Sequence, residues 1–189
     1  MKRTPLSREL IVTEAYKMAE SDTLGNLSLR GVARNLNVQP QTLYHYFPSL
    51  EDLKLAVAIQ GRELLMRQLY ANLVPVSGMD ALRVFAMTIF QFAEAHPSFQ
   101  EMLTRAFTGT NAALPITSIE SADVRHVLLD ILTPMIANQT ERERTARAFL
   151  ATLFGYAKLS INGFFKDVDV EEDFRNIVEF LIKAVAGQE

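Results

Sequence analysis

The chain has 189 residues, of which 49% are hydrophobic and 22% are charged, and its net charge is −3. This composition is typical of a globular protein with ample core, and the absence of cysteine excludes disulfides, thiol catalysis and cysteine-bound metals. No apolar run reaches the roughly 18 residues that span a membrane, and the opening residues MKRTPLSREL lack an apolar signal core. We therefore expect a cytoplasmic protein without a membrane segment.

The charges are unevenly distributed along the chain. Residues 1–46 carry six basic and four acidic side chains, whereas residues 61–189 carry twelve basic and sixteen acidic ones. The overall negative charge argues against nucleic acid as a partner. The sign asymmetry gives modest support for a DNA-facing N-terminal end attached to an acidic remainder.

The first predicted helix runs to about Ser21, with Thr4 and Ser7 as overlapping N-caps. Its apolar residues recur at helical spacing and predict one buried stripe: Leu10, Ile11, Ala15, Met18 and Ala19. Basic residues precede or open this helix, and they suit either phosphate contacts or a solvated terminus: Lys2, Arg3 and Arg8.

Two short helices joined by a tight turn are predicted next, between Leu27 and Phe47. Ser28 suits the N-cap of the first helix, because its hydroxyl can accept an unpaired backbone N–H. Asn37 falls where that helix must stop, and asparagine tolerates the left-handed conformation that such a stop requires. Pro40 opens the second helix, which we expect to end near Tyr46.

The second helix presents polar side chains that carry almost no charge: Gln41, Thr42, Tyr44, His45 and Tyr46. Amide, hydroxyl, imidazole and phenol groups suit the donor and acceptor edges of bases in a major groove. A helix–turn–helix places its second helix in that groove. The alternative, a merely solvated helix, more typically carries Lys and Glu.

Residues around this motif resemble, in order and spacing, the DNA-binding signature of the tetracycline-repressor (TetR) family: Arg30, Ala33, Leu36, Val38, Thr42, Leu43, Tyr44, Phe47, Pro48, Ser49, Glu51, Asp52 and Leu53. The resemblance covers about the first 55 residues. It implies an all-helical homodimer, usually a repressor, that a small ligand releases from its operator. Asn37 departs from the family's usual turn glycine, and Leu50 stands where the family commonly has a phosphate-contacting lysine.

We predict that two groups of side chains contact double-stranded operator DNA. Those expected at base edges are Gln39, Gln41, Tyr44 and His45, next to Pro40. Those expected to hold phosphates or frame the groove are Arg30, Thr42 and Tyr46. Lys54 is a candidate to replace the contact missing at Leu50, although a solvated lysine is the simpler interpretation.

The remainder reads as helix after helix, without the alternation typical of strands. Pro48 breaks the chain and Ser49 caps a long helix from about Leu50 to Leu73. Further helices are expected at about 79–95, 98–107, 118–137, 140–164 and 170–186, with Thr140 and Glu143 as a capping box. The sequence thus predicts an all-α fold with a DNA-binding domain over residues 1–48 and a ligand-binding and dimerisation domain over 49–189.

Large apolar side chains of the second domain suit a ligand pocket: Met66, Phe85, Ile89, Phe92, Met102, Phe107, Phe149 and Phe154. Ordinary core packing explains them equally well. Residues 106–116 are rich in small side chains and are predicted to form a mobile loop near the pocket entrance. The expected ligand is small and largely apolar.

Helices 140–164 and 170–186 are predicted to form the homodimer surface. Ala148, Ala151, Thr152 and Gly155 place small side chains on one side of the first helix, which permits close approach of another helix. The second helix has a broad apolar stripe between Phe174 and Val185. Two such helices packed on their two-fold mates form a four-helix arrangement; burial within one subunit is the alternative.

Motifs for catalysis and metal binding are lacking. His45, His96 and His126 are far apart and have no partner at metal-ligand spacing, and neither a nucleophile elbow nor a phosphate-binding glycine loop is present. We therefore predict a regulator without cofactor or enzymatic activity. A helical protein-binding adaptor on the same scaffold is the main alternative, and an all-α enzyme is a weaker one.

Overall fold

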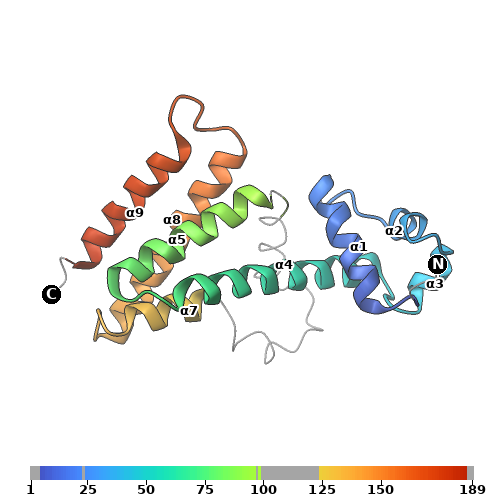
Figure 1. Cartoon of the computed structure of the whole chain (residues 1–189), viewed down its shortest axis with the longest axis horizontal. Coiled ribbons are helices and arrows are strands. Elements are labelled where there is room, and N and C mark those ends of the chain that lie inside the picture. Colours follow the sequence, from blue (N-terminus) through green and yellow to red (C-terminus); the bar gives the residue numbers. More distant parts are fainter. Residues whose placement is uncertain (1–4, 23, 97, 99–123, 187–189) are drawn as a thin grey trace. The chain divides into compact units, whose positions relative to one another are not determined.

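The computed structural model describes residues 5–22, 24–96, 98 and 124–186. Across these ranges the regular elements are all helices, as Figure 1 shows. They are α1 (Arg8–Ser21), α2 (Leu29–Asn35), α3 (Pro40–Tyr44), α4 (Leu50–Leu73), α5 (Gly78–Ala95), α7 (Val124–Leu132), α8 (Gln139–Ile161) and α9 (Val170–Ala186). The predicted all-α fold is confirmed. The helix predicted at 98–107 and the loop predicted at 106–116 lie outside the described residues, apart from Ser98.

The chain divides into two compact units. In the described residues, the first contains 5–64 together with His96 and Ser98, and the second contains 65–95 and 124–186. The division falls inside α4, after Leu64, whereas the sequence prediction drew a domain boundary at 48/49, before α4. That boundary stays a prediction.

The core of the first unit joins α1, α2, α3 and the first half of α4. Its completely buried side chains include Ile11 and Ala15 of α1, Val32 of α2, Leu43 of α3 and Leu53 of α4. In α1, α2 and α4 the buried apolar residues recur three or four positions apart, so one face of each helix is removed from water. The short α3 contributes Leu43.

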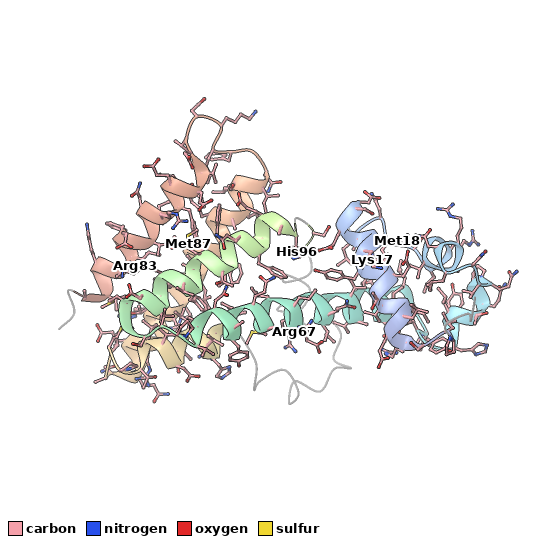
Figure 2. The ribbon with its side chains drawn as sticks, in the orientation of Figure 1. Lys17, Met18, Arg67, Arg83, Met87 and His96 are labelled. Carbon is pink, nitrogen blue, oxygen red and sulfur yellow. The ribbon has the colours of Figure 1, made fainter. Side chains whose placement is uncertain are left out.

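His96 and Ser98 join the first unit although they follow α5 in the chain. The Ser98 hydroxyl is buried and donates a hydrogen bond to the backbone oxygen of Ala19. Nδ1 of His96 contacts the carboxylate of Glu20 and lies 3.4 Å from the hydroxyl of Tyr16 (Figure 2). The last turns of α1 are therefore held by a segment distant in sequence.

Several helices begin where a capping side chain accepts one of the unpaired backbone N–H groups of the first turn. The hydroxyls of Ser7, Ser28 and Ser49 each accept a backbone N–H three residues ahead, at 3.1 Å, as predicted for all three. The N-cap of helix α8 was predicted wrongly: the helix begins at Gln139, and the side chain of Asn138 accepts the N–H of Glu141 at 3.1 Å. Thr140 therefore lies inside the helix.

Glu143, the second member of that predicted capping box, is instead placed between two arginines. Its carboxylate lies 3.7 Å from Arg125 of α7 and 3.6 Å from Arg147, one turn ahead on α8. The contact across to α7 is available because Glu143 lies one turn inside α8 rather than at its N-terminal end.

Three helices end earlier than predicted. Helix α3 ends at Tyr44 rather than Tyr46, and α7 ends at Leu132, two residues before Pro134, rather than near 137. Helix α8 ends at Ile161, before Gly163, whose positive φ of 71° terminates the helix. Elsewhere α4 and α9 have the predicted bounds.

Helix α5 is the centre of the second unit and contacts α7, α8 and α9. The ring of Phe90 is buried and stacks on Phe174 of α9, with centroids 4.4 Å apart. Arg83 of α5 adds a surface pair to Glu179 of α9, with Nη2 to Oε2 at 2.8 Å (Figure 2). The arginine lowers the pKa of the Glu179 carboxyl by its hydrogen bond. No helix among the described residues is sufficiently long and apolar to cross a membrane.

The turn between α2 and α3 has the backbone conformation that the sequence predicts. Asn37 has a φ of 59°, and the N–H of Val38 returns to the Ala33 carbonyl at 3.0 Å. The chain thereby reverses direction and α3 can begin at Pro40.

We expect Asn37→Ala to destabilise the protein by about 1 kcal/mol, because alanine is strained in the left-handed region. Asn37→Gly should lose clearly less, since glycine adopts this conformation without strain. Urea denaturation of the parent and both variants measures the difference. Equal losses in the two variants would contradict this account and assign the stability to the asparagine side chain.

Candidate DNA interface and dimer surface

Helix α3 is held in place by its buried side. Leu43 and Phe47 are completely buried. The guanidinium of Arg8 donates to the backbone oxygen of Tyr46 at 2.7 Å and lies 4.2 Å from the Phe47 ring centroid. The hydroxyl of Tyr46 donates to the backbone oxygen of Leu6 at 3.0 Å. Residues around the start of α1 therefore set the position and the end of α3.

The opposite side of α3 is exposed. Gln39, Gln41, Tyr44 and His45 are exposed, and Tyr44 retains 54% of its accessible surface. Their amide, phenol and imidazole groups form a polar surface with little formal charge. Such a surface offers hydrogen-bond donors and acceptors without a strong requirement for a charged partner.

The remaining predicted DNA-contacting residues differ in their surroundings. Arg30 is exposed near the start of α2, and Pro40 and Thr42 are partly buried. Tyr46 is partly buried, with its hydroxyl donated to Leu6. Lys54 is only 7% exposed, and its Nζ lies 3.6 Å from Glu51. The structure therefore gives no support to Lys54 as a replacement for a phosphate-contacting lysine at position 50.

Helix α9 has two apolar stripes. One stripe is buried in the second unit and contains Phe174, Val178, Ile182 and Val185. The other follows Ile177, Phe180, Leu181 and Ala184; Phe180 is 71% exposed and Ala184 is also exposed. Within the part of the subunit that the structure describes, the first stripe is fully buried and the second is not.

Helix α8 continues the exposed apolar surface with small residues. Ala148, Ala151 and Gly155 are exposed at spacings of three and four residues, and Thr152 is partly buried beside them. A Cβ added at Gly155 would meet nothing within 4 Å in the described part of the subunit. A shallow cleft of about 230 Å³ between α8 and α9 includes Ala148, Leu181 and Ala184 in its lining.

The predicted pocket residues are mostly inside the second unit. Phe85, Ile89, Phe92, Phe149 and Met66 are between 0% and 5% exposed, and Phe154 is partly buried. Met102 and Phe107 lie outside the described residues. Core packing accounts for the buried side chains, and burial alone does not distinguish core from ligand contact.

Comparison with known families decides what this arrangement belongs to. The family model described as "Tetracyclin repressor-like, C-terminal domain" matches residues 82–185, more than half of the chain. The chain belongs to the TetR family.

Relatives and solved structures agree with this assignment. The HTH-type transcriptional regulator Rv0681 of Mycobacterium tuberculosis is 25% identical over 184 residues, covering 97% of this chain and 82% of the relative. The transcriptional regulator SCO7222, a TetR from Streptomyces coelicolor, has a TM-score of 0.75 at 17% identity, covering 97% and 99% of the two chains. BioQ bound to its double-stranded DNA operator has a TM-score of 0.71 at 17% identity, covering 96% and 99%.

In this TetR-family protein, sequence analysis missed the positioning role of Arg8. Its contacts reach Tyr46 and Phe47, nearly forty residues along the chain. Sequence analysis considered only phosphate or solvent around its guanidinium. The residues next to Arg8 in the sequence do not indicate that its guanidinium contacts a carbonyl at the end of another helix.

We expect Tyr46→Phe to lower the free energy of unfolding by about 1 kcal/mol, because the Leu6 carbonyl loses its hydrogen bond. The matched variant Tyr44→Phe removes a hydroxyl from the exposed face and should leave the unfolding free energy unchanged. Thermal and urea unfolding of both variants provide the comparison. Similar losses for both tyrosines would show that the Tyr46–Leu6 hydrogen bond does not hold α3.

Proposed function

We propose that this TetR-family regulator is a homodimeric repressor that binds operator DNA through α3 and dissociates when a small ligand binds its second unit. The observation that carries the proposal is the two-sided character of α3. One side is fixed by buried Leu43 and Phe47, while the other presents exposed Gln41, Tyr44 and His45.

The proposed contacts divide into two kinds. Gln39, Gln41, Tyr44 and His45 approach base edges, which provide sequence discrimination. Exposed Arg30, with Thr42, contacts phosphates, which provide register and salt-dependent affinity. Lys54 is left out of this proposal because it is buried beside Glu51. Tyr46 acts by holding α3 against Leu6.

The proposed dimer uses the exposed stripes of α8 and α9. Water-exposed Phe180 and Leu159, together with small Ala148 and Gly155, make a surface on which two-fold related helices can approach closely. Two identical subunits then present two copies of α3, which matches a two-fold symmetric operator. Half-site centres are expected about 34 Å apart, or a multiple of it.

Ligand response is proposed to follow a two-state scheme. A ligand that prefers the conformation with low DNA affinity shifts the population toward it, by no more than its difference in affinity for the two states. The buried apolar residues around Phe85, Ile89 and Phe92, with Met66 and Phe149, are the proposed surroundings for an apolar ligand. They also form the packed core, so a ligand there must displace core contacts.

Gln41→Ala should weaken binding to operator DNA about tenfold, because a good amide–base pair contributes roughly 1–3 kcal/mol of discrimination. Binding to scrambled DNA should change little. Fluorescence anisotropy with the promoter beside the protein's own gene measures both. Gln91→Ala, at an exposed position of α5, is the matched control and should leave both affinities unchanged. An equal loss on the two DNAs would contradict base reading by Gln41.

Arg30→Ala should weaken binding to operator and scrambled DNA alike and reduce the salt slope by about one, since one phosphate contact is lost. Titrations at several salt concentrations give this slope. An unchanged slope would exclude a phosphate contact at Arg30. If the parent protein bound no duplex even at low salt, the DNA-binding proposal would fail in favour of a protein-binding adaptor.

Phe180→Asp should weaken dimerisation about tenfold or more, because it places a carboxylate in the proposed apolar interface. Gly155→Leu should act in the same direction by steric exclusion, since a Cβ added at this position meets nothing within 4 Å in the described part of the subunit. Analytical ultracentrifugation measures the dissociation constant. Val74→Asp, at a position 86% exposed in the α4–α5 connection, is the control. Dimers of parental stability in both interface variants would contradict this surface.

A further inference from the structure

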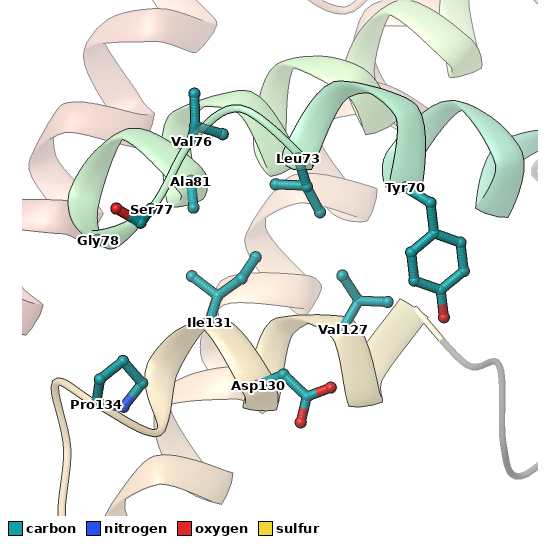
Figure 3. Close-up of a pocket in the computed structure, with 10 residues that line it drawn as sticks. All are labelled: Tyr70, Leu73, Val76, Ser77, Gly78, Ala81, Val127, Asp130, Ile131 and Pro134. Atoms are coloured by element: carbon teal, nitrogen blue, oxygen red, sulfur yellow. The ribbon is translucent and has the colours of Figure 1, made fainter.

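A second cleft, away from Phe85, Ile89 and Phe92 of α5, opens at the surface of the second unit. It has a volume of about 320 Å³ and lies among the end of α4, the start of α5 and α7 (Figure 3). Its walls are apolar: Val127 and Ile131 point from α7 toward Leu73 of α4, and Val76 and Ala81 close the side next to α5. This volume is sufficient for a small organic molecule.

Two side chains give the cleft a chemical preference. Among the ten residues that line it, Asp130 alone carries a formal charge, and its carboxylate is exposed at the edge. Tyr70 extends from α4 toward α7 and keeps 51% of its surface accessible. A carboxylate and an aromatic face bordering the same apolar cleft are complementary to a cation.

Among the residues that the structure describes, the basic groups nearest in sequence do not pair with Asp130. Arg125, on α7, is directed to Glu143 of α8 at 3.7 Å. His126 precedes Asp130 by one helical turn, and no ion pair joins the two side chains among the described residues. Asp130 therefore remains a negative group next to an apolar surface.

We propose that this cleft binds a small organic ammonium ion with an aryl or branched alkyl body. The ammonium group pairs with the Asp130 carboxylate and lies against the Tyr70 ring, while the apolar body packs on Leu73, Val127 and Ile131. A neutral apolar molecule would cover the same walls but would leave the carboxylate without a counter-charge as water is displaced. An anion would be repelled by it.

The test uses phenethylammonium as the probe, at pH 8 and low salt, with the full-length protein. Isothermal titration calorimetry gives its affinity, and amide chemical shifts identify the binding place, with Ala81, Val127 and Ile131 expected to respond. Asp130→Asn should weaken binding about threefold or more, the range of an exposed ion pair. Tyr70→Ala should weaken it similarly, whereas Tyr70→Phe retains the aromatic face and should bind as the parent does.

Matched controls separate the proposed contacts from general electrostatics. Asp167→Asn removes the same charge from the exposed α8–α9 connection and should leave the affinity unchanged. Phenethyl alcohol and phenylacetate carry the same aryl body without the positive charge and should bind more weakly. The proposal is overturned if the ammonium probe does not bind, if Asp130→Asn binds it as tightly as the parent, or if the alcohol matches the ammonium.

The ammonium site and DNA regulation can be tested independently. The binding measurement needs no DNA, so it succeeds or fails whatever the operator affinity is. We further expect that a probe bound in the cleft weakens operator binding, and this expectation rests on the proposed repressor function. Fluorescence anisotropy of operator binding, measured with and without the probe, tests it. Probe binding at the cleft without any DNA affinity would support the site and reject the repressor. Operator binding without probe binding would reject the ammonium site and leave the repressor function supported.

Discussion

Helix α3 has only five residues, and an isolated helix of that length is not stable in water. Its exposed polar face buries little surface, so the helix is held from the other side. Leu43 and Phe47 anchor it in the core, Arg8 binds the carbonyl at its end, and Tyr46 fixes that end to Leu6. The positions of the candidate DNA-reading side chains therefore depend on Arg8 of α1 and on Leu6. This leaves the exposed face free to carry side chains chosen for recognition rather than for folding.

Features that depend on neighbouring residues could be predicted from the sequence. Serine hydroxyls at positions 7, 28 and 49 accept nearby N–H groups, and Asn37 adopts a conformation that few residues tolerate. The error at α8 has the same local origin, because Asn138 and Thr140 are both suitable caps and the capping-box pattern favoured the wrong one. Contacts between distant residues could not be predicted. No spacing rule links Arg8 to Tyr46, and none predicts that Lys54 is only 7% exposed.

The second unit shows why an apolar stripe does not by itself reveal its partner. Phe174 and Phe180 lie on the same amphipathic helix and both count as apolar, yet the first stacks on Phe90 and the second remains 71% exposed. The packing of α5 and α8 on α9 separates the inner stripe from the outer one. The same limit applies to the predicted pocket. A buried phenylalanine satisfies both core packing and ligand contact, whereas a carboxylate at the rim of an apolar cleft, such as Asp130, is more informative because core packing does not require it.

The first unit is discontinuous in sequence, since His96 and Ser98 return to α1 after the chain has passed through α5. This affects how the DNA-binding unit of one family member can be joined to the second unit of another. A chimaera made by a single crossover in α4 would give a new reading head the host's residues at 96 and 98. Ala19 is completely buried, and its carbonyl accepts a hydrogen bond from Ser98. If the host has no hydroxyl at position 98, this carbonyl loses its hydrogen bond, which destabilises the protein. A functional graft would need a second crossover, so that the short return segment travels with the helix it holds.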